Sequence, residues 1–399
     1  MSRRDTIEIL QMEVEIPDVV QKKANHTFDK IRENKVEVDA DGKIIPYEKI
    51  KTVSKFPKKR IGIIVAVVTL ALATVSVAAA YLNWSKSLSE GLQATQEQKV
   101  QMEENNMSAF VDQACTDQGI TITAVQSITD NYYTHIAFKI EGYEPEEGVQ
   151  PDFETVKVTV DGKDDFSFGG RFYDGLVQGA DGGVANADGT PLDTDKNGGL
   201  IEHYVMDDGS LEYRITLANA HEKGYFINKP IHVEIYNLGT VSKAEYFNEI
   251  EGTWSFDWDL QGSEDMKECT LNVPLGDTDA TVIKASITPI SLRAEYEFPR
   301  RKKTVNYIDE NGEEKSVLWD ADPPALTGIK MKDGTLYPFI SLGPDSTGYE
   351  SEDSDIYTRT FPIDRIINVD QVESLLFIKS YAQEGETISE DNFYVVPLE

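Results

Sequence analysis

The pattern of apolar and polar positions changes along the chain, and its most distinct part is the run from Ile61 to Leu82. This run contains no charged residue, Pro, Asn or Gln. A helix rises about 1.5 Å per residue, so a helix of this length would cross a hydrocarbon layer of roughly 30 Å. Basic residues without acidic ones occupy positions 51–60, whereas both signs occur after the run. Since excess Lys and Arg marks the cytoplasmic side, the sequence predicts a single-pass cell-membrane protein with a transmembrane helix at 61–82, a cytoplasmic N-terminus and an extracytoplasmic C-terminal part.

A cleaved signal peptide is the alternative interpretation of this run, because small residues of the kind found at cleavage sites occur at Ala78, Ala79 and Ala80. Secretory signals, however, begin near the N-terminus and have an apolar core of about 7–15 residues. Here residues 1–60 precede the run, and the run is longer. We therefore expect an uncleaved anchor that crosses the lipid bilayer once.

The N-terminal segment, residues 1–60, contains one amphipathic pattern. Four apolar residues recur in it at helical spacing: Val20, Ala24, Phe28 and Ile31. Spacings of four, four and three place them on one side of a short helix. Because a segment of this size cannot bury a large core of its own, the apolar stripe predicts docking on a partner. A membrane-surface or partly disordered tail is the alternative.

After the apolar run, residues 83–117 are rich in Ser, Glu, Gln and Lys and contain no Pro. Trp84 suits the interface between lipid and water. Leu88 and Leu92 lie four residues apart and therefore on one side of a helix. This stretch predicts a juxtamembrane helical stalk.

From residue 118 onward the apolar period becomes two. The alternation is clear at 135–140 and at 253–260, where two Trp and one Phe share a face. Asp161-Gly162 and the stretch 309–312 are hairpin signals. These features predict antiparallel strands joined by tight turns.

The polar stretch 261–268 divides this region, so we expect one extracytoplasmic β domain at 118–260 and a second at 261–399. Short strands, frequent turns and the lack of a long amphipathic helix predict a mainly β fold class. We expect two β-sandwich domains of immunoglobulin-like type rather than an α/β enzyme.

The charge is distributed unevenly. The chain has 38 basic and 70 acidic residues and a formal net charge of −32. Residues 1–60 hold 14 basic and 11 acidic residues, so residues 61–399 hold 24 and 59 and carry −35. Such a surface disfavours direct binding to nucleic-acid phosphate or anionic lipid headgroups. It could attract cations or a basic partner, and a surface that serves only solubility is the alternative.

One loop carries a calcium-like pattern. Asp193, Asp195 and Asn197 stand at alternate positions before Gly198, as in the first half of a D-x-D-x-N-G calcium loop. The position that should supply a bidentate Glu is Tyr204. A Ca²⁺ site with these ligands is therefore one interpretation and a solvated turn is the other, and no other cofactor is indicated.

Two cysteines, Cys115 and Cys269, lie in the part predicted to be exterior. They could form a disulfide if the fold brings their Cα atoms within about 7 Å, or remain thiols. The five histidines form no metal-ligand pair, and no Ser or Cys stands in a nucleophile-elbow motif. We find no pattern for catalysis and do not expect an enzyme.

Several stretches resemble a family of single-pass Gram-positive bacterial membrane proteins that carry an uncharacterised conserved domain and are associated with extracytoplasmic-function sigma factors. The resemblance rests on the segment 16–31, the basic run into the anchor, the residues 84–88, the strands within 119–139 and the stretch 272–298. It implies an anti-sigma factor. Zinc-type anti-sigma domains use a His followed by two Cys, whereas His26 stands alone here, so the resemblance implies binding without zinc.

The resemblance also implies a mechanism. The stripe of Val20, Ala24, Phe28 and Ile31 would hold a sigma factor at the membrane until an exterior event, such as envelope stress, a ligand or proteolysis, releases it. The alternative is a cell-surface binding or adhesion module that binds an exterior ligand and has no transcriptional role. In that case the N-terminal segment would serve only for membrane insertion.

Overall fold

The computed structural model describes residues 84–179, 182–196, 198–242, 245–309, 312–343, 345–381 and 388–398. These residues belong to one compact unit, Trp84–Glu399. The predicted helix that carries Val20, Ala24, Phe28 and Ile31 and the predicted transmembrane segment 61–82 lie outside the described residues. Within the described ranges, no helix is long and apolar enough to cross a membrane.

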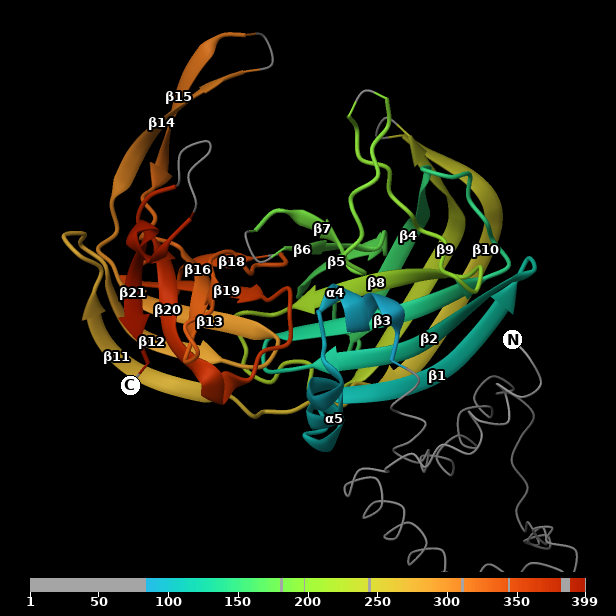
Figure 1. The fold of residues 1–399 in the computed structure, drawn as a ribbon, viewed down its shortest axis with the longest axis horizontal. Helices are drawn as coiled ribbons and strands as arrows, with labels where there is room; N and C mark the ends of the chain where they lie inside the picture. The colour runs from blue at the N-terminus through green and yellow to red at the C-terminus, as the bar shows by residue number, and fades with distance from the viewer. Residues whose placement is uncertain are drawn as a thin grey trace, which may run out of the picture. The chain divides into compact units, whose positions relative to one another are not determined.

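The unit consists of two short helices followed by strands (Figure 1). Its N-terminal half contains α4 (Lys86–Gly91), α5 (Gln96–Glu104), β1 (Ser108–Asp117), β2 (Ile120–Thr129), β3 (Tyr133–Glu141), β4 (Gln150–Val160), β5 (Ser167–Phe172), β6 (Leu176–Gln178), β7 (Val184–Asn186), β8 (Leu211–Ala218), β9 (Pro230–Ser242) and β10 (Glu245–Asp259). Its C-terminal half contains β11 (Lys267–Pro274), β12 (Thr281–Ile287), β13 (Ser291–Glu297), β14 (Lys302–Ile308), β15 (Glu314–Asp320), β16 (Leu326–Met331), β17 (Leu336–Tyr337), β18 (Ser346–Tyr349), β19 (Ile356–Pro362), η2 (Val369–Gln371), β20 (Val372–Ile378), η3 (Glu390–Asn392) and β21 (Phe393–Pro397).

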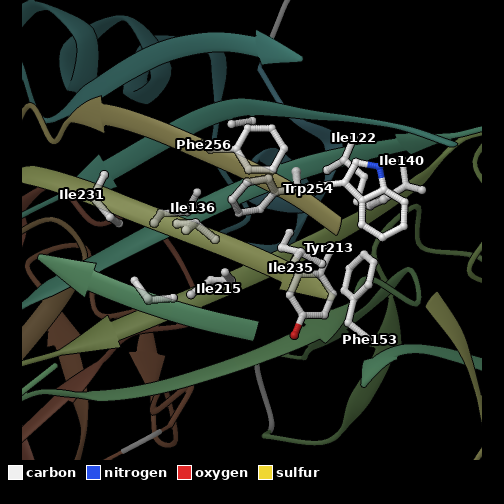
Figure 2. Packing of buried hydrophobic residues seen from close by; sticks show 14 of the residues in the cluster. Ile122, Ile136, Ile140, Phe153, Tyr213, Ile215, Ile231, Ile235, Trp254 and Phe256 are labelled. Carbon is white, nitrogen blue, oxygen red and sulfur yellow. The ribbon is translucent and has the colours of Figure 1, made fainter. Parts of the chain in front are cut away.

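The first β body is built from two antiparallel sheets that share one core. The larger sheet has the order β1-β2-β3-β8-β5 and the smaller has the order β10-β9-β4. Successive side chains of a strand point to opposite faces, so the alternating apolar residues of both sheets meet between them (Figure 2). Phe153 packs edge-on against Tyr213 with ring centroids 4.9 Å apart. The predicted aromatic strand is confirmed, because Trp254 and Phe256 of β10 lie in this core.

The second β body has its own core and the same kind of construction. Its sheets have the orders β11-β12-β13-β19-β18 and β17-β16-β20-β21. Tyr296, Phe361 and Phe377 are buried between them. The chain passes from the first core to the second between Leu260 and Lys267.

The two bodies repeat one strand order. In the larger sheets, β1, β2, β3, β8 and β5 correspond to β11, β12, β13, β19 and β18, and in the smaller sheets β10, β9 and β4 correspond to β21, β20 and β16. All these neighbours pair antiparallel. An immunoglobulin domain has the order ABED and CFG, in which three consecutive strands are not neighbours in one sheet. The strands confirm the predicted mainly β fold class. The strand order does not confirm the predicted immunoglobulin-like type.

Residues 83–117, predicted as a helical stalk, contain α4, α5 and β1. The helix prediction is wrong for Ser108–Asp117, which pairs with β2 along its length. This strand was hidden because half of its residues are polar and because a bulge between Phe110 and Gln113 interrupts the period of two. Leu88 and Leu92 were predicted to share one side of a stalk helix; in the structure both are buried in one cluster inside the unit.

Candidate functional site

The first described residues form a structure that we call the helical clasp, defined as residues 84–107. Figure 1 shows its helices α4 and α5 between the two β bodies. α4 begins where the Ser85 hydroxyl oxygen accepts a hydrogen bond from the backbone N–H of Leu88. α5 begins with a capping box, in which the side chains of Thr95 and Gln98 each accept a hydrogen bond from the backbone N–H of the other residue. Each helix therefore begins at a capping side chain that is close to it in the sequence.

A buried carboxylate of the first body fixes the start of α4. Glu212 of β8 accepts hydrogen bonds from the backbone N–H groups of Ser87, at 2.7 Å, and Lys86, at 2.9 Å, and from the Ser85 hydroxyl, at 2.8 Å. The first N–H groups of a helix have no partner within the helix and carry partial positive charge. The negative charge of Glu212 satisfies them, so this carboxylate attaches the clasp to the first body.

The apolar side of the clasp contacts both bodies. One buried cluster contains the clasp residues Leu88, Leu92, Met102 and Met107, the first-body residues Ile128 and Ala137, and the second-body residues Ile290 and Ile366. Ile128 faces the clasp because a register shift between Ala124 and Gln126 changes the face to which the alternate residues of β2 point. Because of the bulge, β2 contributes Ala124 to the core of the first body and Ile128 to the cluster under the clasp.

Backbone hydrogen bonds connect the clasp to the second body. The carbonyl oxygen of Leu92 accepts a 2.8 Å hydrogen bond from the Ile366 N–H, and the Gln98 side-chain amide donates to the Ile366 carbonyl at 2.6 Å. The Gln93 amide donates to the carbonyl of Asp364 at 3.3 Å and to that of Gln178, in the two-stranded sheet of β6 and β7, at 3.1 Å. The clasp thus holds backbone groups of the second body and of the β6–β7 sheet at once.

Two buried titratable groups lie on the β3–β8 surface below α4. Burial lowers the pKa of the Arg214 guanidinium to about 10, and Nη1 of this residue has no hydrogen-bond partner among the described residues. Burial, together with the charge of Arg214, lowers the pKa of His135 to about 3. The His135 ring contacts the Thr216 hydroxyl through Nδ1 at 3.0 Å. A Cβ at Gly91 would lie 2.4 Å from Nη1 of Arg214, so a larger residue where α4 crosses this arginine would require the guanidinium or the helix to shift.

The two bodies also meet directly at Asp130. Its Oδ1 accepts from the backbone N–H groups of Tyr132 and Tyr133, and its Oδ2 accepts from the hydroxyls of Thr288 and Ser291 at 2.5 Å. Burial raises the pKa of this carboxyl, against the opposing effect of these hydrogen bonds. The β2–β3 turn and the β12–β13 turn, which occupy equivalent places in the two bodies, are thereby joined.

A groove lies beside α5. Its volume is about 560 Å³, and it is lined by Gln98 and Met102 of the clasp, by Asp265 and Met266 of the connection between the bodies, and by Ile366 and Val369 of the second body. A molecule bound in this groove would contact the clasp and the second body together.

The residues of the calcium-like loop have other contacts. Asp193 Oδ2 lies 2.9 Å from Nε2 of His203, and Asp195 Oδ1 accepts a hydrogen bond from the Gly199 backbone N–H at 2.8 Å. Asn197 lies outside the described residues. No three His, Cys, Asp or Glu side chains in the described parts of the chain come together as metal ligands.

The two cysteines lie in different cores. Cys115 is half-buried on β1 of the first body, and Cys269 is buried on β11 of the second. No disulfide joins these two described residues. The structure places the two side chains with different cores, on strands of separate sheets.

Sequence reasoning missed Glu212, Arg214 and Asp130. Glu212 and Arg214 occupy polar positions of an alternating strand, a pattern typical of a solvent-exposed face. Asp130 stands in a turn, where Asp is common for local reasons. A usable signal was the glycine at position 91, since Gly within a helical pattern has a packing reason in many helices.

These features define a two-body antiparallel β protein with an N-terminal helical clasp. Residues 54–142 match the family model described as "Domain of unknown function (DUF4179)". The matched range includes the predicted transmembrane segment, the clasp and β1 to β3. A solved structure described as "The crystal structure of the conserved domain protein from Bacillus anthracis" is similar at 13% identity and a TM-score of 0.37, over 74% of this chain and 87% of that chain. No curated protein matches the chain.

Proposed function

We propose that this chain is a membrane-anchored regulatory protein of the Gram-positive type described above, an anti-sigma factor that transmits an exterior signal across the membrane. The observation that carries the proposal is the position of the clasp. The clasp begins at Trp84, directly after the predicted transmembrane segment, and it holds both β bodies at their joint. A change in the angle between the bodies would therefore change the contacts of the clasp, and the clasp leads directly into the predicted transmembrane segment.

The coupling has a defined physical basis. Glu212 binds the clasp to the first body, and Ile366 binds it to the second. We consider an equilibrium between two arrangements of the two bodies at their joint. An exterior ligand can shift this equilibrium only by the difference in its affinity for the two arrangements. The groove beside α5 is a suitable place for such a ligand, because its lining comes from the clasp and from the second body.

On the cytoplasmic side, the stripe of Val20, Ala24, Phe28 and Ile31 would bind the sigma factor. An amphipathic helix laid into an apolar groove is a recurrent mode of recognition. The lone His26 indicates that this binding does not need zinc.

The test is co-purification of a sigma factor with the full-length protein from membranes. Phe28→Asp places a charge on the apolar stripe and should abolish co-purification. Lys22→Asp changes the charge on the opposite side of the same predicted helix and should preserve it. Retention of the sigma factor by Phe28→Asp, or equal loss in both variants, would contradict docking through the stripe.

A cell-surface binding module remains the second candidate, favoured by the exposed apolar side chains of β14 and β15. Deletion of residues 1–50 separates the two functions. An anti-sigma factor without this segment should release sigma-dependent transcription, whereas an adhesion module should leave transcription unchanged.

A further inference from the structure

The hairpin formed by β14 and β15 stands apart from the sheets of the second body. Its two strands pair with each other and with no other described strand. Figure 1 shows it projecting from the second body, on the side away from α5. An isolated two-stranded hairpin is marginally stable in water. A third strand or a covering surface would stabilise it.

One face of the hairpin is apolar. Residues directly opposite each other in an antiparallel pair lie on the same face. Lys303 lies opposite Trp319, Val305 opposite Val317, and Tyr307 opposite Lys315. We call this the Trp319 face: an apolar row of Val305, Tyr307, Val317 and Trp319 with a lysine at each end.

The exposure of this hairpin is unusual for the molecule. Trp319 is 60% exposed and Tyr307 is 49% exposed. Of the thirteen large apolar side chains that are strongly exposed among the described residues, five lie on β14 and β15: Tyr307, Val317 and Trp319 on the Trp319 face, and Ile308 and Leu318 on the opposite face. Single exposed apolar residues are ordinary, but a concentration of them marks an interaction site.

The hairpin also offers hydrogen-bonding edges. The outer edge of each strand presents backbone N–H and C=O groups without a neighbouring described strand. Such an edge accepts an added peptide strand, with affinity from main-chain hydrogen bonds and specificity from alternate side chains.

Charge around the hairpin selects the partner. The basic side chains at its root are already paired: Arg301 with Asp279, Lys302 with Asp320 at 2.9 Å, and Lys303 with Asp322 at 2.8 Å. The acidic loop 350–355 lies beside the root, where the Arg300 side chain donates to the Ser351 carbonyl at 2.9 Å. Glu352 and Asp353 of this loop form no ion pair among the described residues. Beside the root, the carboxylates of Glu352 and Asp353 are therefore available to a basic partner.

We propose that the β14–β15 hairpin binds a basic, extended protein segment with apolar residues at alternate positions, which adds to the hairpin as a third strand and covers the Trp319 face. A second copy of this chain fits poorly, since residues 61–399 carry a net charge of −35 and would repel one another. The same charge disfavours an anionic lipid surface. The proposal does not depend on sigma-factor binding.

The test uses the full-length protein in detergent micelles and a labelled synthetic peptide of alternating Lys and Val. Trp319 is a built-in reporter, because covering an exposed indole shifts its fluorescence to shorter wavelength. The peptide should bind, shift the emission, and bind more weakly as salt is raised. A peptide of alternating Glu and Val, and a Lys–Val peptide with a central Pro that removes a backbone N–H, should each bind at least tenfold more weakly.

Variants then locate the site. Trp319→Ser should weaken binding at least tenfold, whereas Leu318→Ser, on the opposite face of the same strand, should change it less than twofold. Trp319→Phe keeps the apolar face and should retain binding while losing the emission shift. Equal binding by Trp319→Ser and the parent protein, equal binding of the acidic peptide, or an emission shift produced by phosphatidylcholine vesicles and not by peptide would overturn the proposal. Dimerisation that depends on Trp319 would overturn it in favour of a second copy.

Discussion

The carboxylate of Glu212 lies 2.7 Å from the backbone nitrogen of Ser87, across 125 residues of sequence. This contact places a negative charge of β8 at the first turn of α4, where helix N–H groups need an acceptor. It connects the outer face of the first body to the segment that follows the predicted membrane crossing. The start of the clasp therefore depends on the charge of one buried residue.

Replacing Glu212 by Gln should release the start of α4. The amide would present an N–H₂ group to donors that now face a carboxylate, at a cost of about 1.5–3 kcal/mol. Hydrogen exchange of residues 85–92 should accelerate, while exchange in β9 stays unchanged. Glu97→Gln, on the exposed side of α5, is the matched control and should leave exchange as in the parent protein. Unaltered protection in Glu212→Gln would refute the role of the carboxylate.

The crossing of α4 over Arg214 should be sensitive to a single methyl group. Gly91→Ala would bring a Cβ within 2.4 Å of Nη1, so the guanidinium or the helix must move. We expect a loss of about 1–3 kcal/mol in the free energy of unfolding, measured by urea denaturation. Gly169→Ala is the control, because a Cβ there meets nothing within 4 Å. Equal effects of the two substitutions would show that Gly91 has no packing role.

His135 should make the unit less stable in acid. Its pKa is about 3 in the folded protein and near 6.5 in an unfolded chain, so folding favours the neutral ring. Its contribution is complete above about pH 6.5 and is lost as the pH falls toward 3, with a slope of at most about 1.4 kcal/mol per pH unit. His135→Gln should reduce this slope in urea melts between pH 7 and 5. Thr216→Val removes a ring contact and should lower stability while keeping the slope; identical slopes in His135→Gln and the parent would contradict the prediction.

At Asp130, the stability of the joint should depend more on the hydrogen-bond geometry of the side chain than on its charge. Asp130→Ala leaves two backbone N–H groups and two hydroxyls without their acceptor, and we expect it to lower the free energy of unfolding by about 2–4 kcal/mol. Asp130→Asn keeps one oxygen, and the hydroxyls of Thr288 and Ser291 can rotate to accept from its amide. The Asn variant should therefore lose less than half as much. Equal losses measured by calorimetry would assign the effect to the charge instead.

Local pattern predicted much of the two cores. The alternation around Trp254 and Phe256 identified β10, and the stretch 309–312 identified the hairpin of β14 and β15. These elements were accessible because their apolar periods are regular and their turns carry Gly. β1 was not accessible, since polar residues and a bulge conceal its period.

The candidate site could not be predicted from the sequence for a different reason. Glu212 and Arg214 look like exposed positions of a strand, but α4 packs over them and they are buried. One oxygen of Asp130 caps its own turn, whereas the other meets Thr288 and Ser291, which are 158 and 161 residues away. The burial and the hydrogen bonds of these side chains depend on segments that are distant in sequence, so no local hydrophobic pattern predicts them.

The contact between Gln98 and Ile366 spans 268 residues of sequence. During synthesis, α4 and α5 therefore emerge long before the chain that completes their surroundings. A protein cut short anywhere before residue 366 would leave Leu88 and Leu92 partly uncovered, however well its first body had folded. Completion of the clasp thus requires that translation has passed residue 366.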